Sequence, residues 1–359
     1  MMNNPFYTSA NHGEFEYLEL GDFALDGGGV IRDAKLAYAT TGRLNAARDN
    51  AILIPHMYSG SSQHMRSIFV GPELAIDPEK YFVIFPNQFG NGLSSSPHNS
   101  DGAQYGPAFP EISIGDDVRA QHVLVREKLG IDRLELVLGW SMGAQQTYEW
   151  AVQYPKMVKR AAPIAGTART TPHNLLFTRV AADAIRFDPA WSDGLYAEPH
   201  AVSAGLKRHA HVFALLGASA QLYKEERWRD IGFASLEDFM SGFWEKWFQP
   251  MDPNNLLCML SKWQRADIGS HAGGNLASAL GRIVAKTYVI AFEEDMFMTV
   301  RDCEAEQRLI AGSELRVLPS LWGHFTPLVP LPANLDPINR TLRELLAVSV
   351  DETTSAIAA

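Results

Sequence analysis

The sequence predicts an α/β fold, in which a mostly parallel central sheet carries helices on both faces and an inserted helical cap. Short apolar runs typical of buried strands alternate with helix-forming stretches in two parts of the chain, and strand signals vanish between these parts. In addition, Gly139-Trp140-Ser141-Met142-Gly143 joins one apolar run directly to a helix-forming stretch. We therefore expect a core domain formed by residues 1–165 and 281–359, with a helical cap (lid) domain at residues 166–280.

The strands of the predicted sheet follow one another along the chain. Residues 15–25 and 34–40 tend to alternate apolar and polar side chains around a glycine-rich break, so we expect an antiparallel hairpin at the sheet edge. The later strands are continuous apolar runs, as expected for parallel strands that are buried on both faces. These runs occupy residues 50–55, 81–85, 134–138, 158–164, 285–292 and 314–318.

Helices are predicted between these strands and throughout the insertion. In the core they end near residues 76, 129, 155, 310 and 348, at glycine or proline in several cases. In the insertion the helical stretches are residues 181–186, 203–216 and 236–248, and the last of these is rich in Trp, Phe and Met. The two ends, residues 1–12 and 351–359, are interpreted as a loose arm and a frayed tail.

The composition is that of an ordinary globular enzyme. The chain has 359 residues and a formal net charge of −10, which argues against nucleic acid and an anionic membrane surface as partners. Its two cysteines, Cys258 and Cys303, are too few for a framework of disulfides. No secretory signal is visible, and no apolar run is long enough to span a membrane. We expect a cytoplasmic monomer or homodimer.

Ser141 is the predicted nucleophile. A strand, a G-x-S-x-G turn and a helix form a nucleophile elbow, in which the serine hydroxyl projects above the sheet. The turn is so tight that only small residues, typically glycines, fit two positions before and after the serine. The bare motif also occurs by chance in ordinary turns between a strand and a helix. The flanking strand and helix favour the elbow.

A serine hydroxyl needs an adjacent base, and the base needs a carboxylate that orients it. In an elbow architecture these groups follow in the order Ser, Asp or Glu, His, each on a loop after a strand. His324 follows the last predicted strand, and the preceding strand ends at Glu293, Glu294 and Asp295. We prefer Asp295 as the acid, with Glu294 as the main alternative.

Charge on the substrate carbonyl needs two hydrogen-bond donors that are fixed before the reaction. One should be the backbone N–H of Met142, which follows the nucleophile. The other should come from the loop after the strand at residues 50–55, where Tyr58 is the candidate; the alternative is that Tyr58 only packs. No histidine has a metal-ligand spacing with Cys or acidic residues, so we predict no metal and no cofactor.

A group of stretches along the chain is far more specific than the elbow motif alone. These stretches are residues 49–56, 112–121, 139–143, 149–155, 252–255 and 323–324. On them the chain resembles, over nearly its whole length, the homoserine O-acetyltransferase family of α/β-hydrolase-fold enzymes. The resemblance implies the α/β-hydrolase fold, a triad of Ser141, Asp295 and His324, an acyl-serine intermediate, and an oxyanion hole at Tyr58 and Met142.

The chain departs from the transferases where they bind their acceptor. Trp140 replaces the second glycine of their usual elbow, and Phe325 replaces the aspartate that suits the amino group of homoserine. Arg208 matches an arginine that holds the acceptor carboxylate, but Leu215 lies where its tyrosine partner is expected, and Gly115 replaces an arginine of a usual Ile-Arg-Asp stretch. A site that has lost polar partners binds a zwitterionic acceptor poorly.

These departures predict a carboxylic-ester hydrolase that acts on small, uncharged esters, most simply acetyl esters, through an acyl-serine. Trp140, Phe325, Arg208 and Leu215 are the predicted substrate-pocket residues, and the two aromatic rings should make the pocket small and apolar. The alternative is a homoserine O-acetyltransferase that depends on acetyl-CoA, or a related acyltransferase. A catalytically silent binding protein is a third reading, which the intact order of Ser, Asp and His disfavours.

Overall fold

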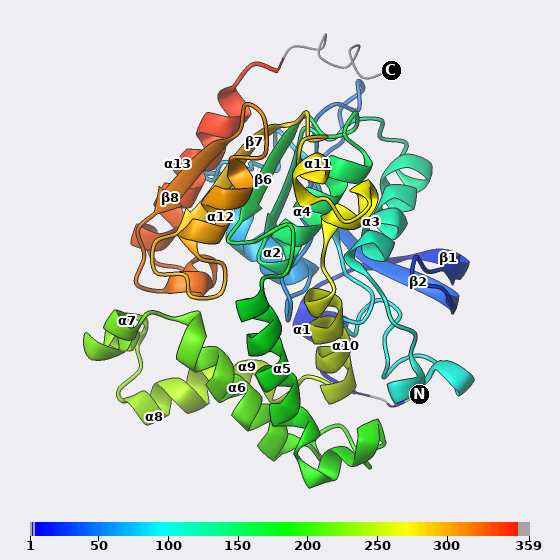
Figure 1. Ribbon diagram of the computed structural model, residues 1–359, viewed down its shortest axis with the longest axis vertical. Coiled ribbons are helices and arrows are strands. Elements are labelled where there is room, and N and C mark those ends of the chain that lie inside the picture. Colours follow the sequence, from blue (N-terminus) through cyan, green and yellow to red (C-terminus); the bar gives the residue numbers. More distant parts are fainter. Residues whose placement is uncertain (1, 3, 351–359) are drawn as a thin grey trace.

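The computed structural model describes residue 2 and residues 4–350, which form one eight-stranded sheet surrounded by helices (Figure 1). The strand order is β1-β2-β4-β3-β5-β6-β7-β8. The pairs β1–β2 and β2–β4 are antiparallel, and every pair from β4 to β8 is parallel, which confirms the predicted fold class. The strands are β1 Glu16–Ala24, β2 Val30–Thr41, β3 Ala51–Leu53, β4 Phe82–Pro86, β5 Leu136–Trp140, β6 Arg160–Ile164, β7 Lys286–Phe292 and β8 Glu314–Leu318.

Parallel order brings the carboxyl ends of several strands to one edge of the sheet. The residues of β3, β5 and β6 are all buried, because helices cover both faces of the central strands. Helix α4 contacts β5 and β6, α2 contacts β4, and α12 and α13 contact β7 and β8. These helices are α2 Ser62–Phe69, α3 Ile114–Val123, α4 Met142–Gln153, α12 Val300–Gln307 and α13 Pro332–Ala347.

The segment between β6 and β7 contains helices and no strand, and all of its residues are described. Figure 1 shows most of these helices gathered at one end of the sheet. The stretch predicted at residues 236–248 is helical throughout, as two α-helical turns joined by a π-helical turn at Met240–Glu245. The helices are α5 Pro172–Arg186, α6 Ser203–Gly217, α7 Ala220–Lys224, α8 Leu236–Phe239, α9 Lys246–Phe248, α10 Pro253–Gln264 and α11 Leu276–Leu280.

The interpretation of residues 1–12 as a loose arm is wrong for its described residues. The arm contains α1 Ser9–His12, and the side chains of Asn4 and His12 are buried. The hydroxyl of Tyr7 accepts a hydrogen bond of 2.9 Å from the backbone N–H of Asp252. The arm is therefore held by partners far along the chain, which local composition does not indicate. The tail predicted at residues 351–359 lies outside the described part of the chain.

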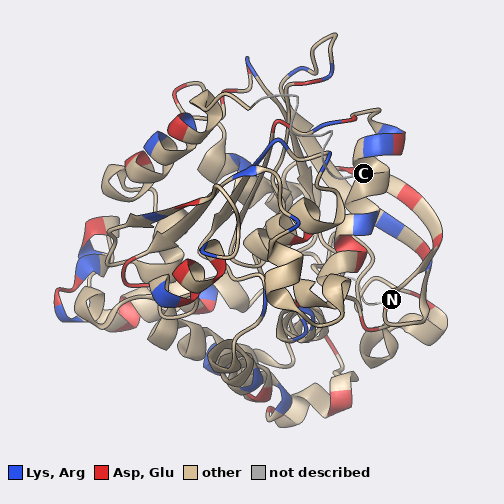
Figure 2. Ribbon diagram, turned by 45° about the horizontal axis from the view of Figure 1, so that its top comes forward, with Lys and Arg blue, Asp and Glu red and all other residues tan. Residues whose placement is uncertain are grey.

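Lys and Arg residues and Asp and Glu residues are interspersed along the ribbon (Figure 2). One ion pair lies in the interior. Lys262 of α10 and Asp117 of α3 form a salt bridge, and both side chains are fully buried. The Lys262 ammonium also donates to the Phe89 carbonyl at 2.8 Å, and the Asp117 carboxylate accepts from the Phe89 N–H at 2.8 Å. Burial raises the pKa of Asp117 to about 6, although Lys262 opposes this shift. The pair ties the helical insertion to the core.

Replacing Lys262→Met should lower the free energy of unfolding by about 3–5 kcal/mol, because it leaves a buried carboxyl group without its partner. Lys35→Met is the control, since Lys35 pairs with Glu19 on the surface and should cost at most about 1 kcal/mol. Denaturant unfolding of the three proteins measures both values. Equal losses in the two variants would contradict a structural role for the buried pair.

Candidate active site

Ser141 lies in a sharp turn between β5 and α4. Its backbone has φ 59° and ψ −120°, a conformation that residues with a side chain rarely adopt and that is kept only where the surroundings impose it. A Cβ atom on Gly139 would lie 2.0 Å from the Gly143 carbonyl oxygen, and one on Gly143 would lie 2.4 Å from the Pro55 carbonyl oxygen. Only glycine fits at both positions, as the sequence interpretation required.

The side chains of Ser141, His324 and Asp295 form a continuous chain of hydrogen bonds. The Ser141 hydroxyl lies 2.8 Å from His324 Nε2, and His324 Nδ1 lies 2.8 Å from Asp295 Oδ2. All three residues are buried. Of the three candidate acids it is Asp295 that faces the histidine, while Glu293 and Glu294 are exposed.

Asp295 is oriented by its own loop. Its second oxygen, Oδ1, accepts hydrogen bonds from the N–H groups of Phe297 at 2.7 Å and Met298 at 2.9 Å. Oδ2 therefore remains for His324 Nδ1, which carries the proton because a carboxylate can only accept. His324 Nε2 is then the acceptor for the proton of the Ser141 hydroxyl, as a general base requires.

The amides of Tyr58 and Met142 suit an oxyanion hole. Met142 is the first residue of α4, where backbone N–H groups have no partner within the helix. Neither amide donates a hydrogen bond to any group in residues 4–350. The Tyr58 side chain is occupied elsewhere, because its hydroxyl donates to the Leu256 carbonyl at 3.1 Å and its ring stacks on Phe213. Any contribution of Tyr58 to the hole must come from its backbone.

A small apolar pocket of about 320 Å³ opens at Ser141 and His324. Trp140 and Phe325 line it, as the sequence indicated. The insertion adds aromatic rings to the pocket lining. From the sequence, the aromatic residues at 203–216 and 236–248 were interpreted mainly as core of the cap, although these stretches were the signal that could have indicated the lining. The remaining lining residues are Met57, Tyr58, Ser59, Phe213, Trp247, Trp263 and Phe297.

The structure does not place Arg208 and Leu215 in this pocket, so their prediction as pocket residues is wrong. Both are exposed on α6, and the Leu215 side chain is 74% exposed. Phe213 of the same helix faces the pocket. Successive residues of a helix are rotated by about 100°. Arg208 and Leu215 therefore point away from the face that Phe213 occupies, which the match by position did not take into account.

Trp140 contacts the histidine loop directly. Its indole N–H donates a hydrogen bond of 3.1 Å to the His324 backbone carbonyl. Its ring lies edge-on to Phe325, with the centroids 6.2 Å apart. The side chain is buried, with 1% exposed. Trp140 thus joins the turn that carries Ser141 to the loop that carries His324.

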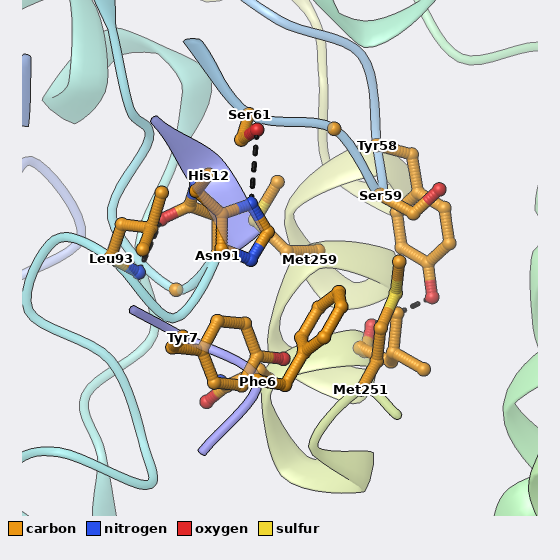
Figure 3. A pocket seen from close by; sticks show the side chains of 14 residues that line it. Phe6, Tyr7, His12, Tyr58, Ser59, Ser61, Asn91, Leu93, Met251 and Met259 are labelled. Atoms are coloured by element: carbon orange, nitrogen blue, oxygen red, sulfur yellow. Dashed lines mark hydrogen bonds between the residues drawn. The ribbon is translucent and has the colours of Figure 1, made fainter. Parts of the chain in front are cut away.

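A second cavity lies beside the loop after β3 (Figure 3). It shares Tyr58 and Ser59 with the pocket at Ser141 and His324, which we call the catalytic pocket. We call the second cavity the arm cavity, because Phe6, Tyr7 and His12 of the N-terminal arm line it. His12 Nδ1 lies 3.2 Å from the Ser61 hydroxyl, while its buried Nε2 has no hydrogen-bond partner within the described residues. Burial lowers the pKa of His12 to about 4. The arm cavity therefore adjoins the loop after β3, and the side chain of His12 that lines it there is neutral and polar.

The described residues contain no group of three or more His, Cys, Asp or Glu side chains that could hold a metal ion. None of their helices is both long and apolar enough to cross a membrane.

The comparison with known families agrees with this geometry. The family described as alpha/beta hydrolase fold matches residues 50–330, which include Ser141, Asp295 and His324. The chain belongs to the α/β-hydrolase family.

Three relatives place the chain more closely within the α/β hydrolases. It is 50% identical to an ethyl acetate hydrolase of Pseudomonas veronii, over 96% of this chain and 99% of the relative. The solved structure of an acetylester hydrolase from Corynebacterium glutamicum is 47% identical, with a TM-score of 0.95 over 97% of this chain and 100% of that one. A homoserine O-acetyltransferase of Leifsonia xyli is 31% identical, over 86% of this chain and 82% of the relative. The resemblance to the homoserine O-acetyltransferase group is confirmed.

Replacing Trp140→Phe should lower kcat about three- to tenfold, because the ring remains but one hydrogen bond to the histidine loop is lost. Steady-state hydrolysis of a short ester measures this effect. Trp228→Phe is the control, since Trp228 is also buried but its indole N–H has no partner within the described residues and it does not line the pocket. The role of Trp140 would be refuted by an unchanged kcat in Trp140→Phe.

Proposed function

We propose that this protein is a serine carboxylic-ester hydrolase that cleaves small, uncharged esters, in the first place acetyl esters. The observation that carries the proposal is the hydrogen-bonded chain from Ser141 through His324 to Asp295 at the base of an apolar pocket. Relatives with about half of their residues identical bear the names ethyl acetate hydrolase and acetylester hydrolase, which supports the same substrate class.

In the first half of the proposed reaction, Ser141 Oγ attacks the acyl carbon while His324 Nε2 takes the hydroxyl proton. The Asp295 carboxylate stabilises the resulting imidazolium. The N–H groups of Tyr58 and Met142 bind the oxyanion of the tetrahedral intermediate. The intermediate collapses when the bond between carbon and the alcohol oxygen breaks, and His324 gives its proton to the leaving alcohol. The product is an acyl-serine.

In the second half, water attacks the acyl-serine in place of the alcohol, and the steps run in the opposite direction. His324 Nε2 takes a proton from the water as its oxygen attacks the acyl carbon, and the same N–H groups hold the new oxyanion. The bond to Ser141 Oγ then breaks, His324 returns the proton to that oxygen, and the carboxylic acid leaves. No other co-reactant is needed.

The pocket favours hydrolysis over transfer to homoserine. Among the described residues, His324 and the Tyr58 phenol are the only titratable side chains that line it. The ammonium and carboxylate groups of an amino acid would therefore find no charged partner among them. Burial raises the pKa of Tyr58 well above its usual value, so this phenol stays neutral. Cytoplasmic location and the choice between monomer and homodimer remain predictions from the sequence.

We expect nitrophenyl acetate to be hydrolysed by the wild-type protein and Ser141→Ala to lose nearly all of this activity, about 10⁴-fold or more, because the nucleophile is removed. Ser67→Ala is the control, since Ser67 is an exposed serine of α2. The small pocket should also make nitrophenyl acetate a better substrate than nitrophenyl octanoate. Release of nitrophenol measures all of these rates.

The transferase alternative is tested in the same assay with acetyl-CoA and homoserine. We expect no consumption of acetyl-CoA that depends on homoserine. Such consumption, together with no hydrolysis of any short ester, would overturn the proposal.

A further inference from the structure

The loop after β3, residues 56–61, lies between the catalytic pocket and the arm cavity. Figure 3 shows Tyr58, Ser59 and Ser61 of this loop around the arm cavity. Cavities on two sides leave fewer packing contacts to hold a peptide group in one direction. Hydrogen bonds then help to set the direction of the peptide groups in the loop. The Met57 carbonyl has two partners, the Gly60 N–H at 3.1 Å and the His56 ring at 2.6 Å, and the contact with His56 is the shorter one.

His56 is fully buried and hydrogen-bonded through both ring nitrogens. The backbone N–H of Gln88 donates to its Nε2 at 2.9 Å, and the side-chain amide of Asn91 approaches the same atom at 3.1 Å. A backbone N–H can only donate, so Nε2 is an acceptor without a proton. Burial lowers the pKa of His56 to about 3, which keeps the ring neutral. The single ring proton is therefore on Nδ1.

His56 Nδ1 lies 2.6 Å from the carbonyl oxygen of Met57 and donates its proton to it. The Met57 carbonyl and the Tyr58 N–H belong to the same peptide group, which is planar and trans, so they point in opposite directions. Fixing the carbonyl towards His56 thus fixes the N–H on the other side. A hydrogen bond to the carbonyl also polarises the peptide and makes its N–H a stronger donor.

We propose that His56 is a positioning residue, which aims the Tyr58 N–H at the oxyanion through its hydrogen bond to the Met57 carbonyl. The inference rests on the proposed function, because it deepens the account of the same site. His56 itself does not line the catalytic pocket. Its action is through the peptide group, and its imidazole takes no part in proton transfer.

Two isosteric variants separate the two hydrogen bonds of His56. In His56→Asn the amide nitrogen takes the place of Nδ1, so the donor to the Met57 carbonyl is kept and the acceptor for the Gln88 N–H is lost. In His56→Gln the amide reaches the place of Nε2, so the acceptor is kept and the donor to Met57 is lost. His56→Asn loses the two contacts to Nε2 and His56→Gln loses the one contact to the Met57 carbonyl, so a merely structural role predicts an effect at least as large in His56→Asn.

We expect kcat for nitrophenyl acetate to stay within about threefold of wild type in His56→Asn and to fall about 10–100-fold in His56→Gln, below the loss seen when an oxyanion donor is removed outright. KM should change little in both. The inhibition constant of a short alkylboronic acid, which forms a tetrahedral adduct with the serine, should rise in His56→Gln by the factor that kcat/KM falls. The thermal midpoint should fall at least as far in His56→Asn as in His56→Gln.

Equal losses of kcat in the two variants would overturn the role of His56, as would a loss in His56→Gln that appears only in KM or in the thermal midpoint. Hydrolysis by the wild-type protein tests the proposed function by itself, and the ratio between the two variants tests His56. If His56→Gln does not fold, ¹⁵N NMR of histidine in the wild-type protein gives the answer. The signal lost in His56→Asn should be that of a neutral ring protonated on Nδ1, and a ring protonated on Nε2 would refute the inference.

Discussion

A close contact between two backbone segments sets the geometry around Ser141 in this protein. The Cα atom of Gly143 lies against the Pro55 carbonyl, so near that any side chain would collide with it. The first turn of α4 is thereby brought beside the loop after β3. Met142 and Tyr58, whose amides suit an oxyanion hole, belong to these two segments. The strained turn at Ser141 is held in the same contact, because Gly139 is pressed against the Gly143 carbonyl.

Directed polar contacts then fix the remaining pieces around this turn. Trp140 donates to the carbonyl of His324, and the Asp295 loop orients its own carboxylate through the amides of Phe297 and Met298. The buried pair of Lys262 and Asp117 ties the insertion to the core. Aromatic rings of the insertion line the pocket, and polar groups interact more strongly in such apolar surroundings than in water.

The sequence allowed the fold to be predicted, and also three residues that the structure connects by hydrogen bonds, because both predictions depend on local patterns. Apolar runs and the two glycines around Ser141 are visible without any neighbour in space, and Ser141, Asp295 and His324 follow three separate strands. The choice among Glu293, Glu294 and Asp295 needed the loop conformation. The prediction of Arg208 and Leu215 as pocket residues was wrong, because a match by sequence position does not tell which face of the helix is turned towards the pocket. The packing of Tyr7 depends on a backbone group at Asp252, far along the chain.

The most direct test of the account is to identify the residue that carries the acyl group during turnover. The wild-type protein is mixed with nitrophenyl acetate, quenched with acid at early times, digested and examined by mass spectrometry. The account predicts one acetyl group on the peptide that contains Ser141, on Ser141 itself, and its disappearance as the ester is used up. An acetyl group on a different residue that forms and decays with turnover would contradict it.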